Sequence, residues 1–442
     1  MNRPGQNHAT GINVLIIGAY GLIGCGIAQR LEQDGHTIVG FGRDLATATR
    51  VLPNISWRSG DLRSLTTAPA WLPFLEGIDV VVNCSGALQD GPQDNLEVVH
   101  HHAVDALAQA CASADVRLVQ ISAAGASKAA TTQFLASKAR GDAAIQNAGV
   151  RHHIFRPGLV LARQSYGGTT MLRMLAAVPL IQPIALPDAK IQTVSLDDVA
   201  HAVSAAISGQ IPDGFVGDLV ETETHALRDV VKAIRLWLGF ERAGYEIRIA
   251  PGLTNAMAKI ADGLALLGWR SPLRTTALKV LSDGVTGVPS NLTQFGVPDV
   301  KPLAQTLTDM PAHAEDRLFA RMALLCPILI AVLAVFWFLS GAFGLIRANQ
   351  AALVLERVGW PHGLAVASVV FWAIVDMAIA AAFVYRPLAK QACWAAVLVS
   401  LFYLGASTVF VPHLWLDPLG PMVKVLPGIA LALVARIALD TR

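Results

Sequence analysis

Short apolar runs alternate with amphipathic stretches along the first third of the chain, a pattern typical of strands separated by helices. The runs occupy residues 13–17, 37–41, 79–82, 117–121 and 152–155. Strands at this spacing, with a helix between each pair, predict a parallel sheet covered by helices on both faces. We therefore expect an α/β domain of the Rossmann type, with a doubly wound parallel sheet, over residues 11–160.

The pattern becomes looser between residues 161 and 310. Prolines interrupt shorter elements there, at positions 183, 187, 212, 251 and 272. Such a region is typical of a smaller substrate-side lobe and linker, although the pattern leaves open an extension of the first sheet into it. Residues 257–267 form an amphipathic stretch that fits either a helix on a membrane surface or an ordinary packed helix.

The last third differs because it contains four long apolar stretches. They cover about residues 322–346, 362–385, 391–411 and 421–439. Each is close to the roughly 20 residues that a helix needs to cross a bilayer. We expect an all-α bundle of four transmembrane helices over residues 318–442, with the lipid bilayer as a partner.

The cations beside these stretches predict an orientation. Residues 1–11 lack the apolar core of a signal peptide. One side of the predicted bundle carries Arg317, Arg321, Arg386, Lys390 and Arg442, and the opposite side carries Arg347, Arg357 and Lys424. The positive-inside rule then predicts a multi-pass protein of a bacterial-type inner membrane, with the N-terminal domain and both termini cytoplasmic.

Composition supports a membrane segment and narrows the partners. The 442-residue chain is 53% hydrophobic and 15% charged, which is too apolar for an ordinary soluble enzyme. Its formal net charge of +2 includes no basic block, so nucleic acid is not an expected partner. The five cysteines lack paired spacing, and consecutive side chains in the run 100–102 of histidines point in different directions on a helix, so we predict no metal site.

The first apolar run leads directly into a glycine-rich turn and a helix. Gly18 lets the chain turn sharply, Gly21 lets the backbone approach a pyrophosphate, and Gly24 lets the helix lie close to the sheet. An anion would then rest on the helix N-terminus. This context predicts a dinucleotide site that includes Gly18, Tyr20, Gly21, Leu22, Ile23 and Gly24.

Residues at the ends of the next strands extend this site. Arg43 follows the second run and would pair with a phosphate on the adenosine ribose, which favours NADP over NAD, whereas Asp44 beside it could serve the ribose hydroxyls instead. Asp61 follows a third strand-like stretch, where an aspartate commonly meets the adenine amine. Ser85 closes the fourth strand and should lie near the nicotinamide side of the cofactor.

Together with later motifs, residues 13–240 resemble the short-chain dehydrogenase/reductase superfamily. They look most like its atypical branch, which includes the NmrA-like proteins and the Rossmann-type accessory subunit of respiratory complex I. The motifs are the three glycines, Gly60-Asp61-Leu62, Val119 to Ala126, Ser137 to Asp142, Phe155 to Gly158 and Val194 to Ala200. The resemblance implies an NAD(P)-binding oxidoreductase fold.

The superfamily resemblance also implies a catalytic serine and a tyrosine placed four residues before a lysine. Here Ser122 and Lys138 are the candidate catalytic residues, and Lys138 would also hold the cofactor ribose, but the tyrosine position is Phe134. A phenyl ring cannot donate a proton. Three interpretations remain open: another donor such as Ser122, Ser137, Tyr166 or water; a quinone or flavin-like hydride acceptor that needs no positioned tyrosine; or a cofactor with a structural or sensing role.

The tail resembles the DoxX-like family of four-helix membrane proteins, through Phe338 to Gly341 and Trp415 to Lys424. That resemblance implies membrane residence and a link to quinone or redox processes. Asp376 lies within a predicted span, where it must be either a functional group in a polar pocket or a hydrogen-bonded link between helices, with Lys424 or Arg436 as conceivable partners.

The sequence therefore predicts a membrane-associated NAD(P)H-binding oxidoreductase with NADP as its cofactor and a quinone-like or other lipophilic small molecule as its substrate. The alternative is a non-catalytic NADP-binding scaffold, sensor or assembly factor for a respiratory or ubiquinone-biosynthesis complex, which the phenylalanine at position 134 favours.

Overall fold

A computed structural model describes residues 11–87, 95–269, 271–418 and 420–440. The chain divides into two compact units. The first comprises Met1–Lys259 with Pro272–Asp316, and the second comprises Ile260–Ser271 with Arg317–Arg442. Each unit has its own hydrophobic core, so the two are described separately.

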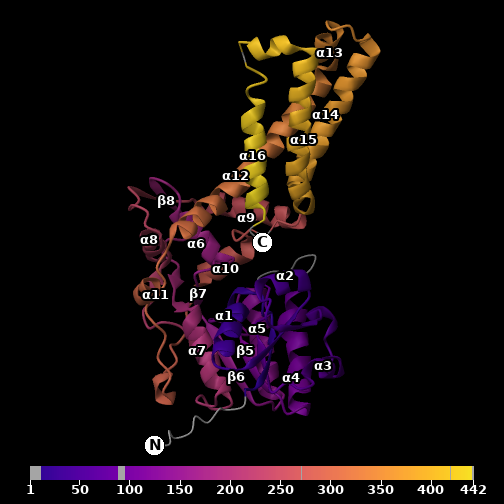
Figure 1. The fold of residues 1–442 in the computed structure, drawn as a ribbon. Coiled ribbons are helices and arrows are strands. Elements are labelled where there is room, and N and C mark those ends of the chain that lie inside the picture. Colours follow the sequence, from indigo (N-terminus) through magenta and orange to yellow (C-terminus); the bar gives the residue numbers. More distant parts are fainter. Residues whose placement is uncertain (1–10, 88–94, 270, 419, 441–442) are drawn as a thin grey trace, which may run out of the picture. The chain divides into compact units, whose positions relative to one another are not determined.

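A seven-stranded parallel sheet forms the centre of the first unit (Figure 1). Its order is β11-β6-β5-β4-β1-β2-β3. The direction of strand progression therefore reverses between β1 and β4, which is the switch point where doubly wound sheets bind ligands. The strands are β1 Asn13–Ile17, β2 Thr37–Gly42, β3 Ser56–Ser59, β4 Val80–Asn83, β5 Arg117–Ile121, β6 His152–Pro157 and β11 Phe215–Leu219.

Helices cover both faces of this sheet because alternate strand residues point to opposite sides. In β1, Val14 and Ile16 pack with the helices α1 and α7, while Leu15 and Ile17 pack with α3, α4 and α5. All four side chains are at most 1% exposed. The helices around the sheet are α1 Leu22–Gln33, α2 Leu45–Val51, α3 Ala68–Leu75, α4 Ala103–Ser113, α5 Gln133–Asn147 and α7 Leu196–Ile207.

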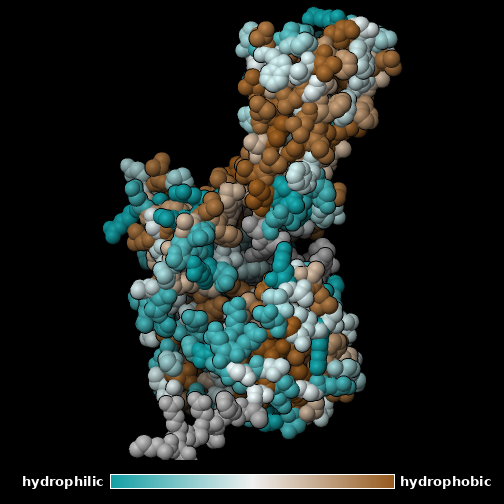
Figure 2. Space-filling model, viewed as in Figure 1, coloured by the Kyte–Doolittle hydropathy of each residue, from teal (hydrophilic) through white to brown (hydrophobic). Residues whose placement is uncertain are grey.

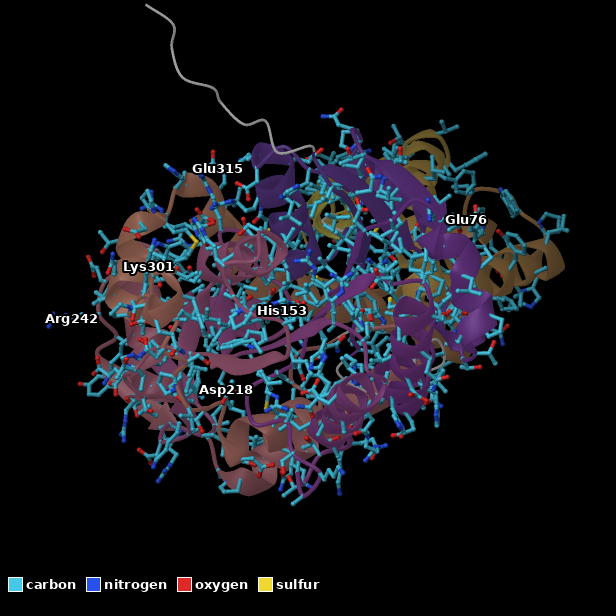
Figure 3. The ribbon with its side chains drawn as sticks, turned by 90° about the horizontal axis from the view of Figure 1, so that it is seen from below. Glu76, His153, Asp218, Arg242, Lys301 and Glu315 are labelled. Atoms are coloured by element: carbon cyan, nitrogen blue, oxygen red, sulfur yellow. The ribbon has the colours of Figure 1, made fainter. Side chains whose placement is uncertain are left out.

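The predicted fold class is confirmed. Each of the five predicted apolar runs is a strand of the sheet, with ends that differ from the prediction by two residues or fewer. The sheet also continues beyond residue 160, the extension that the sequence pattern left open. Its last strand, β11, pairs in parallel with β6, so that Phe215 lies beside His153 and Asp218 beside Arg156. Figure 3 labels His153 and Asp218 on these two neighbouring strands.

The chain between β6 and β11, and after β11, builds a smaller lobe. It contains short two-stranded pairings, β7 with β10, β8 with β13 and β9 with β12. The lobe elements are β7 Leu159–Leu161, α6 Gly168–Ala176, β8 Ile181–Ile184, β9 Lys190–Ile191, β10 Thr193–Ser195, β12 His225–Ala226, α8 Leu227–Trp237, β13 Tyr245–Arg248, α10 Thr275–Asp283 and α11 Leu303–Asp309. Helix α9, Pro251–Leu266, begins in the first unit and belongs to the second from Ile260 on.

The second unit is helical and strongly apolar on its surface (Figure 2). Among the described residues, three helices are long and apolar enough to cross a membrane: α12 Ala314–Ile346, α14 His362–Val384 and α15 Arg386–Phe410. They contain the first three predicted spans, apart from one residue at the end of each of the last two. A short helix that the sequence did not predict, α13 Ala348–Glu356, lies between α12 and α14.

The fourth predicted span needs correction. Residues 421–424 form a turn, and only α16, Val425–Ala438, is helical. Its 14 residues rise about 21 Å, which is less than the roughly 30 Å hydrocarbon core of a bilayer. The end of α16 nevertheless lies beside the start of α15. Two contacts show this: the Arg386 guanidinium donates to the Leu439 carbonyl (3.2 Å), and Lys390 pairs with Asp440 (2.6 Å).

Asp376 links three helices of this unit. Its carboxylate oxygens accept hydrogen bonds from the Ser340 hydroxyl on α12 (2.7 Å) and from the Tyr403 hydroxyl on α15 (2.9 Å). A side chain at Gly341, beside Ser340, would lie 2.5 Å from the Ala373 carbonyl oxygen. Asp376 is therefore a hydrogen-bonded link between helices, one of the two roles considered for it. Its partners are hydroxyl groups and not Lys424 or Arg436.

Candidate functional site

The turn after β1 lies at the switch point of the sheet. Gly18 has a φ of +76°, a backbone conformation that residues other than glycine rarely adopt. Its amide donates to the Phe41 carbonyl at the end of β2 (3.1 Å), and a Cβ at this position would lie 3.2 Å from the Cys84 carbonyl oxygen beyond β4. The turn is therefore fixed between the ends of the two strands that flank β1.

The other two glycines bring helix α1 onto this turn. The Gly21 amide donates to the Gly18 carbonyl (2.9 Å), and a Cβ at Gly24 would overlap that carbonyl and lie 2.9 Å from the Cα of Ala19. Within the described residues, no side chain caps α1, and its first turn carries no acidic residue. The N-terminus of α1 thus presents unpaired amides and a positive dipole end beside the sheet, which suits an anion.

The end of β2 places a cation next to this turn. Tyr20 packs over Gly42, where any side chain would overlap its ring, and its ring centroid is 6.0 Å from that of Trp57. Exposed Arg43 follows directly. Asp44, the alternative ribose ligand, instead caps α2 by accepting from the Thr47 amide (3.0 Å) and hydroxyl (2.6 Å).

The two Thr47 bonds lower the pKa of Asp44, because they stabilise its carboxylate. Asp61 is similarly engaged: it caps the short helix η1, Leu62–Ser64, and pairs with the Arg63 guanidinium at 2.6 Å. The bond from Arg63 is the main cause of a lowered pKa at Asp61, and the charge of Arg43 contributes. Arg43 therefore lies in a small charged cluster at the carboxyl ends of β2 and β3.

Ser85 follows β4 and is held by the end of that strand. Its hydroxyl (2.5 Å) and amide (3.1 Å) both donate to the Asn83 side-chain oxygen, and the Asn83 amide group donates to Gln120 on β5 (2.8 Å). These bonds hold Ser85 at the carboxyl edge of the sheet, on the side predicted for the nicotinamide.

Lys138 reaches the same edge from helix α5. Its ammonium donates to the Ile121 carbonyl at the end of β5 (3.0 Å), and its side chain is buried. Burial lowers the pKa of Lys138, while the negative charge of Asp142 opposes this shift. The Phe134 ring centroid, one helical turn earlier, is 6.0 Å from the Lys138 nitrogen. A Cβ at Gly86 would lie 3.7 Å from that nitrogen.

The Ser122 hydroxyl is bonded to another side chain within the core. Its hydroxyl donates to the Asp142 carboxylate (2.9 Å), and the same oxygen accepts from Arg156 (2.9 Å). Burial raises the pKa of Asp142, and Arg156 opposes the shift. Because the Ser122 hydroxyl is buried and already donates within the core, this arrangement does not favour Ser122 as a proton donor to a substrate.

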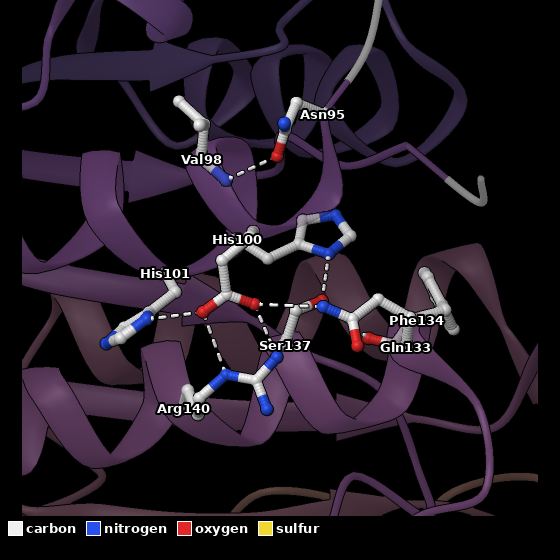
Figure 4. Close-up of polar contacts among 9 residues, drawn as sticks. Asn95, Val98, His100, His101, Gln133, Phe134, Ser137 and Arg140 are labelled. Atoms are coloured by element: carbon white, nitrogen blue, oxygen red, sulfur yellow. Dashed lines mark hydrogen bonds and ion pairs between the residues drawn. The ribbon is translucent and has the colours of Figure 1, made fainter. Parts of the chain in front are cut away.

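His100 is a site residue that the sequence analysis missed. Its Nε2 accepts the Ala87 amide (3.1 Å), so the ring proton lies on Nδ1, which donates to the Ser137 hydroxyl (2.9 Å; Figure 4). Ser137 in turn donates to the Phe134 carbonyl (3.1 Å). Burial and the nearby Lys138 charge hold the pKa of His100 well below its usual value, so the imidazole is neutral.

No local signal in the sequence identifies His100, since its position depends on contact between two helices. It belongs to the π-helix η2, Val98–His102, and its carbonyl oxygen would overlap a side chain at Gly141 on α5. The missing side chain at Gly141 lets η2 approach α5 closely enough for the bond between His100 and Ser137.

The neighbouring histidines form a separate group. Potential ligand atoms of Glu97, His101 and His102 lie within 4.8 Å of one another, although we expected consecutive histidines not to converge. The two imidazole rings stack. Both Glu97 oxygens are already bound by the Arg140 guanidinium, and one also pairs with His101 (2.7 Å; Figure 4). This geometry is an ion-pair network, and we assign no metal to it.

Family comparisons agree with this architecture. Residues 14–208 match the NAD dependent epimerase/dehydratase family, and residues 334–433 match the DoxX-like family. The chain joins an epimerase/dehydratase-type domain to a DoxX-like domain. The predicted resemblance to the short-chain dehydrogenase/reductase superfamily and to DoxX-like proteins is therefore confirmed. No curated protein matches the chain.

Solved structures similar to about two thirds of the chain include proteins in complex with NAD or NADP(H). The Bordetella bronchiseptica enzyme WbmG in complex with NAD has a TM-score of 0.51 at 19% identity, covering 69% of this chain and 94% of WbmG. The Citrobacter sp. triphenylmethane reductase complexed with NADP(H) has a TM-score of 0.51 at 15% identity, with coverages of 67% and 99%. The Escherichia coli NADPH-dependent quinone oxidoreductase QOR2 has a TM-score of 0.51 at 19% identity, with coverages of 67% and 99%.

Because these sequence identities are low, the structural similarity by itself establishes the fold and nothing more. With the family match, the neighbours support a nicotinamide dinucleotide as the cofactor of this domain and an NAD(P)-dependent oxidoreductase or epimerase as its enzyme class. They include NAD and NADP complexes alike, so the choice between the two cofactors rests on the residues of this chain.

Proposed function

We propose that the chain is a membrane-anchored NADP(H)-dependent oxidoreductase whose acceptor is a lipophilic, quinone-like molecule. The observation that carries this proposal is the glycine turn at the switch point, with the uncapped N-terminus of α1 on one side and Lys138 on the other. Both ends of a dinucleotide have a partner of suitable chemistry along this edge.

The residues fit the cofactor in a defined order. The backbone from Gly18 to Gly24, including Tyr20, Leu22 and Ile23, would hold the pyrophosphate. Arg43 would pair with the 2′-phosphate, since Asp44 is committed to capping α2. Asp61 would lie near the adenine, Ser85 near the nicotinamide, and Lys138 would donate to the ribose. When bound, NADPH would supply a hydride.

A quinone-like acceptor suits the remaining groups. Phe134 has no proton to give, and the hydroxyls of Ser122 and Ser137 already donate within the protein. A quinone accepts hydride and can take its proton from water, so it needs no positioned tyrosine. QOR2, a structural neighbour, is named as an NADPH-dependent quinone oxidoreductase. The DoxX-like domain would keep the reductase domain near substrates that dissolve in lipid.

The proposed arrangement has a Rossmann domain over residues 11–160 that extends through α7 and β11 into the next segment, a substrate-side lobe and linker within 161–310, and a membrane domain over 318–442. The return of the chain from α16 to the start of α15 supports an even number of crossings. Both termini would then lie on the cytoplasmic side of a bacterial-type inner membrane, where NADPH is available.

Replacing Arg43 tests the cofactor choice. In lipid nanodiscs, the native chain should oxidise NADPH with a soluble quinone, and Arg43→Ala should raise the KM for NADPH about tenfold, roughly the strength of one charge-assisted contact. The KM for NADH should not change. Arg50→Ala, on exposed α2, is the matched control. An absence of NADPH binding by the folded native chain would overturn the proposal.

The alternative, a non-catalytic NADP-binding scaffold, is favoured by Phe134 alone. If the pocket is that of a reductase, Phe134→Tyr should raise carbonyl-reductase turnover at least about tenfold, because general acid catalysis typically contributes 100-fold or more. The Kd for NADPH should stay constant. Phe134→Leu, which removes the ring without adding a hydroxyl, should show no gain. An absence of turnover by all three proteins, with a series of carbonyls and quinones, would favour the scaffold.

A further inference from the structure

Helix α9 carries an exposed apolar stripe. Leu253, Met257, Ile260 and Leu264 follow one another at helical spacing and are 58%, 39%, 64% and 38% exposed. At 100° per residue, these four side chains project within about 60° of one another. The sequence pattern fitted either a packed helix or a helix on a membrane surface. Because these four side chains are exposed, no other part of the described chain packs against this face.

The other sides of α9 have different characters. Ala258 and Ala261 are buried and form the protein-facing side, whereas Asn255 and Lys259 are exposed on a polar side. A helix with one face against protein, one polar face and one uncovered face of large aliphatic side chains is typical of an interfacial helix. In water alone, the uncovered face would expose a contiguous apolar strip.

The C-terminal end of α9 is attached to the ends of the membrane helices. The Leu267 carbonyl accepts from the Arg386 amide (3.0 Å), and the Trp269 indole donates to the Val384 carbonyl (2.6 Å). The Arg386 guanidinium lies 5.4 Å from the Trp269 ring centroid. Val384 ends α14 and Arg386 begins α15, so this attachment lies at the ends of two helices of membrane-spanning length, where a boundary between bilayer and water would fall. Tryptophan and arginine are typical of that boundary.

We propose that α9 is an interfacial helix, with the stripe of Leu253, Met257, Ile260 and Leu264 inserted between the lipid headgroups of the bilayer that the DoxX-like domain spans. Ile260 and Leu264, which belong to the same unit as α12, α14 and α15, would then add to the apolar surface of that unit, and the stripe needs no protein to cover it. This inference does not depend on the cofactor or on turnover.

Spin-label accessibility in the full-length chain tests this placement. Cysteine is introduced at Ile260 on the stripe or at Asn255 on the polar side, labelled with a nitroxide, and measured in nanodiscs of phosphatidylglycerol and phosphatidylcholine. The unsubstituted chain, labelled in parallel, gives the background from the native cysteines. At position 260, collisions with oxygen should exceed those with a water-soluble nickel chelate several-fold, since oxygen concentrates in lipid. At position 255 the ratio should be reversed.

Two results would overturn the proposal. Equal nickel accessibility at both positions would place the stripe in water. Exclusion of both reagents at position 260 would mean that a second copy or another protein covers it. Labels at Met257 and Leu264 repeat the measurement at both ends of the stripe, so the conclusion does not rest on one variant, and unchanged far-UV circular dichroism shows that each variant is folded.

Discussion

Replacing Gly24 with alanine should raise the Kd for NADPH by at least about 100-fold, equivalent to roughly 2.7 kcal/mol. The added methyl group would overlap the Gly18 carbonyl and lie 2.9 Å from the Cα of Ala19. Both are backbone atoms of a turn that is fixed between β2 and β4, so α1 must move away from it. The amides at the N-terminus of α1 would then no longer point at the pyrophosphate.

Fluorescence titration with NADPH measures this effect, and thermal unfolding of the same protein separates it from loss of fold. Gly168→Ala is the control, because nothing lies within 4 Å of a Cβ at that position. Gly21→Ala gives a milder test, since its Cβ would lie 3.1 Å from the Gly18 oxygen at an exposed position. Unchanged NADPH affinity in the folded Gly24→Ala protein would mean that the cofactor does not bind at this turn.

The strands and the glycine turn could be predicted because their signals are local. A strand buried on both faces must be apolar at every position, as Val14 to Ile17 are, and the turn needs glycines at fixed spacing. The last strand, β11, gave no such signal. It is a half-buried edge strand that contains Gly217 and Asp218, and only its pairing with β6 identifies it.

The site residues also fall into those set by local sequence and those set by distant contacts. Positions set by one turn or strand end, such as Gly18 and Arg43, were readable from the sequence. The partners of Ser122 and His100 were not, because they depend on residues 20 and 37 positions away in the chain, Asp142 and Ser137. The length of α16 also escaped prediction, since the hydropathy of residues 421–424 does not show that they form a turn.

Replacing Arg173 with methionine should lower the free energy of unfolding of the first unit by about 3–5 kcal/mol, the usual effect of leaving a buried charge without its partner. The Arg173 guanidinium donates to Asp316 (3.1 Å) and to the carbonyls of Ala162 (2.9 Å) and Arg163 (2.7 Å). It also lies 4.8 Å from the Trp237 ring centroid. Burial lowers the pKa of Arg173, and the Asp316 carboxylate opposes this shift.

Chemical denaturation of the full-length chain, followed by tryptophan fluorescence, measures the loss. Lys301→Met is the matched control: its pair with Asp309 (2.7 Å) is partly exposed, so its removal should cost less than about 1 kcal/mol. The double variant Arg173→Met with Asp316→Asn removes both charges and keeps an acceptor for the His313 amide. It should recover a large part of the loss, because the cost comes from an unpaired buried carboxylate. A double variant as unstable as Arg173→Met alone would instead assign the loss to the contacts that both variants lack, which are the bonds to the Ala162 and Arg163 carbonyls and the contact with Trp237.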